Sequence, residues 1–208
     1  MKLHSQSFTD GGRIPGEFAF AVPDPKNRVA LSSNLNPHLA WTDAPPDAKS
    51  LALICHDPDA PSVGDDVNQE GRTVADSLPR AEFVHWVLFD LPAEVSEIAA
   101  GAYSSEVVPR GKSGGAAPRD ARQGINDYTG WFANDNDMKG EYYGYDGPCP
   151  PWNDERVHRY VFTLYALDVE ELPPFSPLTA AALRQAMTGH VLASAEITGL
   201  YTLNPALI

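Results

Sequence analysis

Cysteine, positive charge and long apolar runs are all scarce in this chain of 208 residues. Its two cysteines, Cys55 and Cys149, cannot make the dense disulfide framework of a small secreted domain. We expect both to be reduced thiols, although they could also meet across a pocket. No run is long and apolar enough to span a bilayer, and the first residues lack the apolar core of a signal peptide. We therefore expect a soluble, cytoplasmic protein.

The shortage of positive charge narrows the choice of partners. Lysine and arginine number 15 against 28 aspartates and glutamates, so the formal net charge is −13. A surface this acidic repels nucleic-acid backbones and anionic lipid headgroups at long range. We expect no nucleic-acid partner and no stable membrane association. An anionic ligand must be held by short-range donors in a local pocket, against the overall field of the protein.

Apolar residues and turn formers are plentiful. The hydrophobic fraction of 43%, with 19 prolines and 16 glycines, predicts one folded, mainly β domain over residues 1–208. Helices are expected only late in the chain. Ser176 is a good cap for a helix over residues 178–187, residues 190–196 favour a second short helix, and residues 199–203 favour a last strand.

Asp57 follows a short apolar run at residues 50–56, which predicts a buried strand. Pro58 and Pro61 come next and are expected to stop strand pairing and stiffen the exit. Asp57 would then be held at a strand end, where functional groups are often displayed. Capping a turn is the alternative role for Asp57, and it is the role we expect for Asp59.

His85 lies inside a second run, residues 82–92, that is apolar on both sides of it. Such a run predicts a strand buried on both faces. A buried histidine must find partners, because an unpaired polar ring is costly to bury. Taken alone, His85 is most simply a satisfied core histidine. Taken with Asp57 and His158, it is expected to belong to a shared site.

A stiff loop with the sequence Gly-Pro-Cys-Pro-Pro occupies residues 147–151 and leads toward an aromatic and β-branched run at residues 158–165. This run predicts a strand. Side chains alternate across a strand, so His158 and Tyr160 share one face. An imidazole and a phenol would therefore stand together at the mouth of the loop, as one wall of a polar pocket.

These stretches, in this order, resemble the phosphatidylethanolamine-binding protein (PEBP) family, in its bacterial branch, often described as Raf kinase inhibitor-like. The similarity is carried by Asp-Pro-Asp-Ala-Pro-Ser at residues 57–62, His-Trp-Val at 85–87, the prolines of 147–151 and His-Arg-Tyr at 158–160. Each motif alone is weak, but their order and combination are specific. The resemblance covers nearly the whole chain.

The resemblance implies a PEBP-like antiparallel β-sandwich of two sheets with short C-terminal helices. It also implies a small pocket for a phosphate-like or phosphoethanolamine-like anion, with no cofactor. The implied ligand-binding residues are Asp57, Pro61, His85, Gly147, Pro148, Pro151, His158 and Tyr160. Segments 131–145 and 152–157 depart from the animal and plant pattern near the mouth of this pocket. Kinase regulation is therefore not assumed.

The residue chemistry predicts a binding module, and the resemblance implies one of a regulatory or inhibitor type. N–H groups of His85 and His158 and the hydroxyl of Tyr160 would donate to an oxyanion. Asp57 would accept from one imidazole, fix its tautomer and favour its charged form. Binding would then strengthen as the pH falls toward the histidine reference pKa of about 6.5.

Other functions use the same residues. Two histidines and a carboxylate could hydrolyse a phosphoester by acid–base chemistry or hold a metal ion. We expect no enzyme, because no serine or cysteine nucleophile has an evident base within a motif. A protein-interaction module is a further alternative, with no feature that names its partner. The oligomeric state stays open, and a homodimer is among the alternatives.

Overall fold

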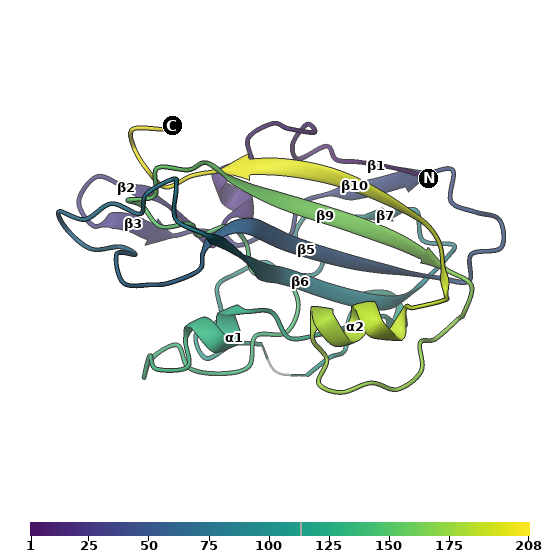
Figure 1. Ribbon diagram of the computed structural model, residues 1–208. Helices are drawn as coiled ribbons and strands as arrows, with labels where there is room; N and C mark the ends of the chain where they lie inside the picture. Colours follow the sequence, from purple (N-terminus) through teal and green to yellow (C-terminus); the bar gives the residue numbers. More distant parts are fainter. Residues whose placement is uncertain (113) are drawn as a thin grey trace.

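The computed structural model describes residues 1–112 and 114–208, and its centre is a five-stranded antiparallel sheet (Figure 1). The strand order is β10-β9-β5-β6-β8. The strands are β5 (Ser50–Pro61), β6 (Arg80–Pro92), β8 (Arg122–Gln123), β9 (His158–Leu167) and β10 (Val191–Tyr201). Each of the three middle strands carries at least one of the predicted functional residues.

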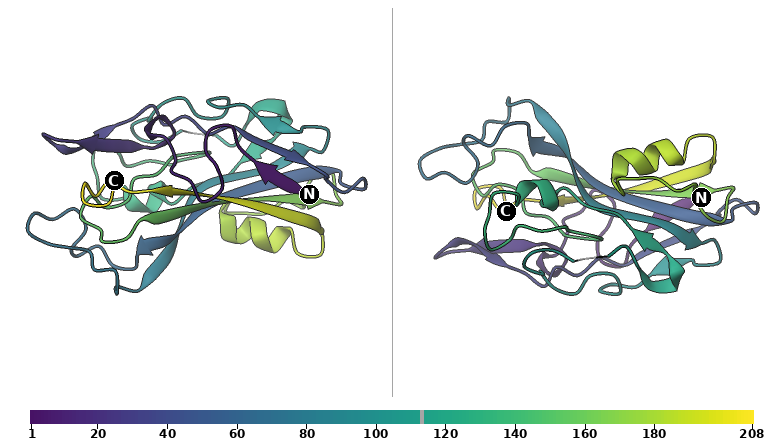
Figure 2. Two further views of the ribbon diagram at one scale, coloured as in Figure 1. Left: turned by 90° about the horizontal axis from the view of Figure 1, so that it is seen from above. Right: turned by 90° about the horizontal axis from the view of Figure 1, so that it is seen from below.

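Smaller elements cover the two faces of this sheet. The order β1-β4-β7 makes a three-stranded sheet, and β2-β3 makes a separate hairpin. Their bounds are β1 (Lys2–His4), β2 (Ala21–Asp24), β3 (Arg28–Leu31), β4 (Leu39–Thr42) and β7 (Glu97–Ile98). Seen from above and below, the yellow-green helix α2 and the purple N-terminal strands lie on opposite sides of the central sheet (Figure 2).

Helices are few and short. They are α1 (Tyr128–Trp131) and α2 (Ala180–Ala186), with 3₁₀ turns η1 (Gly16–Phe18) and η2 (Pro118–Asp120). None of the helices in the described ranges is long and apolar enough to cross a membrane.

Two apolar clusters hold these layers together. The larger lies between the central sheet and the β1-β4-β7 sheet, where Leu53 and Trp86 are fully buried. The smaller lies under α2, where Ile54 packs with Leu183. Leu53 and Ile54 face opposite ways because side chains alternate along a strand. Burial on both faces explains the continuous apolar runs in β5 and β6.

The predicted fold class is confirmed: the protein is mainly β, with antiparallel sheets packed on one another. The hairpin β2-β3 is additional to the two sheets that were expected. The second C-terminal helix, predicted at residues 190–196, is wrong because β10 runs through this segment and pairs with β9. Its alanines and serine have no strong strand preference, so tertiary pairing decides the conformation. The predicted helix at residues 178–187 is confirmed, with Thr179 rather than Ser176 as its cap.

The expectation that two prolines stop strand pairing after Asp57 is also wrong. β5 continues to Pro61, which pairs with Arg80 of β6. The register shifts between Asp57 and Ala60, so Pro58 lies in an irregularity where its missing N–H breaks no ladder bond.

Candidate functional site

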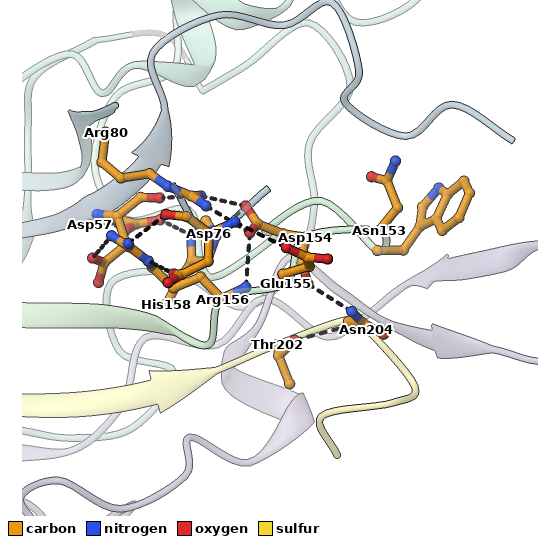
Figure 3. A network of polar contacts seen from close by, with 12 residues as sticks. Asp57, Asp76, Arg80, Asn153, Asp154, Glu155, Arg156, His158, Thr202 and Asn204 are labelled. Carbon is orange, nitrogen blue, oxygen red and sulfur yellow. Dashed lines mark hydrogen bonds and ion pairs between the residues drawn. The ribbon is translucent and has the colours of Figure 1, made fainter. Parts of the chain in front are cut away.

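His158 opens β9 between two buried carboxylates. Its Nδ1 lies 2.7 Å from Oδ2 of Asp57, and its Nε2 lies 3.0 Å from Oδ2 of Asp154 (Figure 3). Burial alone would lower the pKa of His158, but hydrogen bonds with Asp154 and Asp57 raise it to about 9. At neutral pH His158 is therefore an imidazolium, and both of its N–H groups donate to carboxylates.

The predicted bond between Asp57 and a histidine is confirmed, as is its effect on the charge of the ring. The prediction that His158 donates to a ligand is wrong. Its second nitrogen is already bound by Asp154, which comes from the segment between the prolines and β9. The sequence signal for Asp154 was weak, because one carboxylate in a charged loop has many possible partners.

Arginines neutralise the remaining carboxylates of this network. Arg80 of β6 makes a two-pronged ion pair with Asp154, at 2.6 and 3.0 Å. Burial alone would raise the pKa of Asp154, but its bonds from His158 and Arg80 lower it. Arg159 binds both oxygens of Asp59, at 2.8 and 3.0 Å. Asp59 is thus an ion-pair partner, and not only the turn cap that was expected.

Arg156 completes the set by bridging Asp59 at 3.3 Å and Asp76 at 2.6 Å. The network therefore contains as many cations as carboxylates. They are His158, Arg80, Arg156 and Arg159 on one side, and Asp57, Asp59, Asp76 and Asp154 on the other. Within the described part of the chain, each cation of this network is bound to a carboxylate.

His85 of β6 has a different environment. Its Nδ1 lies 2.8 Å from the backbone carbonyl oxygen of Asp146. A carbonyl can only accept a hydrogen bond, so Nδ1 carries the proton and Nε2 of the neutral ring is bare. Burial lowers the pKa of His85 to about 4, against the raising effects of Asp57 and of the carbonyls of Asp146 and Gly147. His85 is neutral at pH 7, and the described residues give Nε2 no hydrogen-bond partner.

Asp146 holds the segment that fixes His85, and sequence reasoning missed it. Its backbone N–H donates to the carbonyl of His85 at 3.0 Å. Its fully buried carboxylate accepts from the side chains of Asn34 and Asn126, both at 2.8 Å, and pairs with Lys112 at 3.3 Å. Burial raises the pKa of Asp146 although Lys112 and the two amides oppose the change. Three loops are thereby tied to the backbone beside His85.

Tyr160 supplies the second unpaired polar atom of the site. The residue is 1% exposed, and its buried hydroxyl has no hydrogen-bond partner in the described residues. Its ring meets that of His85 edge-on, at 5.1 Å between centroids. Burial raises the pKa of Tyr160, and nearby Asp57 raises it further. A buried hydroxyl without a partner costs free energy, so this atom indicates where a ligand or water would bind.

Gly147 lies where the backbone is too crowded for a side chain. Its N–H donates to the Asn34 side chain at 2.8 Å, and its carbonyl accepts from the Tyr128 hydroxyl at 2.8 Å. A Cβ added here would lie 2.2 Å from the carbonyl oxygen of Phe18. Gly147 therefore shapes the loop behind His85.

The prolines of the predicted site support the network from outside. The carbonyl of Pro148 accepts from the N–H of Phe20 at 2.9 Å, and that of Pro151 accepts from the N–H of Asp154 at 3.1 Å. Pro61 ends β5 and is the strand partner of Arg80 in β6.

The structure brings Asp57, His85, His158 and Tyr160 together at one end of the central sheet. They are 3%, 3%, 1% and 1% exposed, so access is tight. Two surface hollows, one beside Pro45 and Ala93 and one beside Lys49 and Asp90, lie at the opposite end of β5. A ligand of the cluster must therefore be small, or the loops around it must move.

Neither a metal centre nor a reactive thiol is visible at the cluster. In residues 1–112 and 114–208, no group of three or more histidine, cysteine, aspartate or glutamate side chains is arranged to hold a metal ion. Cys55 and Cys149 are free thiols. Burial raises the pKa of Cys149 to about 12, so the thiolate form is scarce at neutral pH.

Fold and cluster together define a β-sandwich protein with a small buried polar site at one end of its main sheet. A family model described as phosphatidylethanolamine-binding protein matches residues 4–202. The chain therefore belongs to the phosphatidylethanolamine-binding protein family, as the sequence motifs predicted.

Individual relatives agree with this assignment and with the bacterial branch. The chain is 36% identical over 202 residues to a UPF0098 protein of Methanothermobacter thermautotrophicus, covering 97% of this chain and 98% of that one. It is 31% identical over 205 residues to UPF0098 protein YbhB of Escherichia coli, covering 97% of this chain and all of that one.

Solved structures show the same architecture. A PEBP homologue of Chlamydia trachomatis superposes with a TM-score of 0.65 at 30% identity, over 96% of this chain and 95% of that one. YbcL of E. coli superposes with a TM-score of 0.67 at 24% identity, over 97% of each chain. The second likeness concerns the fold alone.

The crowding at Gly147 predicts that Gly147→Ala destabilises the protein. The added Cβ must displace the backbone at Phe18, which we expect to cost about 1–3 kcal/mol of unfolding free energy. Gly130→Ala is the matched control, because a Cβ there meets nothing within 4 Å. Urea unfolding monitored by tryptophan fluorescence measures both. Equal stability of the two variants would show that the loop accommodates a side chain.

The environment of His158 predicts a pH-dependent contribution to stability. The pKa of His158 is about 9 in the folded protein, against about 6.5 for an unfolded histidine. The stabilisation is therefore complete below about pH 6.5 and is lost as the pH rises through about 9, a change on the order of 3 kcal/mol.

Urea unfolding of the wild type and His158→Gln between about pH 6 and pH 9.5 tests this, because their stability difference should shrink with rising pH. His190→Gln is the control, since His190 pairs with Asp168 at a partly exposed position. A stability difference that stays constant over this range would mean that His158 is not charged in the folded protein.

Proposed function

We propose that this protein is a small-ligand-binding module of the PEBP family that takes a phosphate-like anionic group and acts as a regulator or inhibitor. The observation that supports it is the buried hydroxyl of Tyr160, which has no hydrogen-bond partner in the described residues and whose ring lies 5.1 Å from that of His85 between centroids. Around them, the charged groups are bonded to one another. An unpaired polar atom beside a network of paired charges favours a bound partner.

The local charge balance allows an anion to approach despite the net charge of −13. Asp57 raises the pKa of both His85 and Tyr160, and the imidazolium of His158, 2.7 Å from its carboxylate, offsets its charge. The carboxylate of Asp146 faces away from His85 toward its amide and lysine partners. The hydroxyl of Tyr160 is then the donor for a ligand oxygen, in a low-dielectric setting that strengthens the bond.

We also propose that the site does not perform catalysis. Both nitrogens of His158 are occupied, so it cannot exchange a proton with a substrate without breaking an ion pair. Cys149 is held as a thiol by burial, which raises its pKa to about 12. Neither group has the properties of an activated nucleophile or a general base.

Removing the Tyr160 hydroxyl should weaken ligand binding. We expect Tyr160→Phe to lower the affinity for inorganic phosphate and for phosphoethanolamine about tenfold, because one hydrogen bond to a charged group is lost. Isothermal titration calorimetry measures both ligands, with His190→Gln as the remote control. Unchanged affinity in Tyr160→Phe would place the anion elsewhere, and no binding to the wild type would refute the proposed function.

Phosphoethanolamine binding should strengthen as the pH falls from about 8 to about 6. His158 is already charged, and His85 has a pKa of about 4, so neither gains a proton in this range in the free protein. The proton comes with the ligand, whose second pKa is about 6. We expect close to tenfold higher affinity per pH unit above that value. Calorimetry in buffers of different ionisation enthalpy gives the number of protons taken up with the ligand. An affinity that does not change with pH would contradict uptake of a proton with the ligand.

A further inference from the structure

The tautomer of His85 fixes what the site can offer to an oxyanion. Its Nδ1–H is used by the carbonyl of Asp146, 2.8 Å away. Nε2 therefore presents a lone pair, which repels an oxygen that has no hydrogen. An oxygen that carries a hydrogen would instead donate to it. A carbonyl oxygen accepts a hydrogen bond and never donates one, so the proton of a neutral His85 ring stays on Nδ1.

Donors are otherwise scarce around this ring. Tyr160 contributes one hydroxyl, and Asp57 contributes a carboxylate, which is a second acceptor. The imidazolium of His158 has no N–H to spare. Both terminal nitrogens of Arg80 are bound to Asp154, although its buried Nε has no partner in the described residues. Beside the His85 ring, a bare oxyanion would thus meet two acceptors, Nε2 of His85 and the Asp57 carboxylate, and one donor, the Tyr160 hydroxyl.

We infer that the site selects oxyanions that carry their own proton, and so binds phosphate and phosphate monoesters in preference to sulfate and phosphodiesters. The protonated ligand oxygen donates to Nε2 of His85, and another ligand oxygen accepts from the Tyr160 hydroxyl. This inference rests on the proposed function, because it names the ligand class of the same site.

The ligand classes differ in this one proton. A phosphate monoester keeps a hydroxyl up to about pH 6, since its second pKa lies near that value. Inorganic phosphate keeps a hydroxyl at higher pH as well, because its dianion still carries a P–OH group. Sulfate has the same tetrahedral shape but no proton at that pH, and a diester has none either. The headgroup of an intact phospholipid is a diester. The fitting ligand is therefore a free monoester or phosphate itself, rather than a lipid in a membrane.

Two matched pairs of probes test the selection at about pH 6, where the monoester keeps its proton. Inorganic phosphate against sodium sulfate compares two ions of one shape, and methyl phosphate against dimethyl phosphate compares a monoester with its diester. Calorimetric titration of the full chain gives each affinity. We expect the protonated member of each pair to bind at least about tenfold more tightly, as a site rejects ligands that leave its polar groups unpaired.

Two variants separate the proton requirement from affinity in general. His85→Gln replaces the bare nitrogen with an amide that can donate, so the preference for phosphate over sulfate should shrink toward unity. Tyr160→Phe removes a donor that serves every oxyanion, so it should weaken phosphate and sulfate alike and keep their ratio. Circular dichroism confirms folding, and the wild-type ratios decide the inference even if His85→Gln does not fold.

The outcomes are distinct. Tight binding of phosphate, together with weak binding of sulfate and of dimethyl phosphate, supports the inference. Equal affinity for both members of each pair overturns it while the proposed anion-binding function stands. Failure of all probes to bind overturns both.

Discussion

One buried bridge, Asp57–His158–Asp154, holds this end of the protein together. A charge is stable in a protein interior only when it is paired and hydrogen-bonded, and both nitrogens of His158 meet this requirement. Through Arg80, the bridge reaches from β9 to the loop before it, to β5 and to β6. Segments that are far apart in sequence are thus fixed relative to one another, and a long acidic chain acquires a locally neutral site.

The two histidines show how environment sets chemistry. His158 faces carboxylates and is charged at neutral pH, while His85 faces a backbone carbonyl in an apolar setting and is neutral. His158 stabilises the fold, because both of its N–H groups donate to carboxylates of the protein. For the second, His85, we propose a role in recognition, in which its Nε2 and the hydroxyl of Tyr160 contact the ligand. The proposed selectivity follows from this division.

Strand positions were predictable where hydrophobic runs were strong. The central strands β5, β6 and β9 stand where the apolar patterns placed them, and they carry Asp57, His85 and Tyr160 to one end of the sheet. Asp154 and Asp146 were not predictable. Their roles depend on loop folding and on partners such as Arg80 and Lys112 at remote positions, which no local pattern specifies.

The protonation states of the two rings test this account most directly. Nitrogen NMR of the histidine side chains, with His85→Gln and His158→Gln to assign the signals, reports each ring at neutral pH. The account predicts that His158 is protonated at both nitrogens and that His85 carries its single proton on Nδ1. A neutral His158, or a His85 protonated on Nε2, would contradict it.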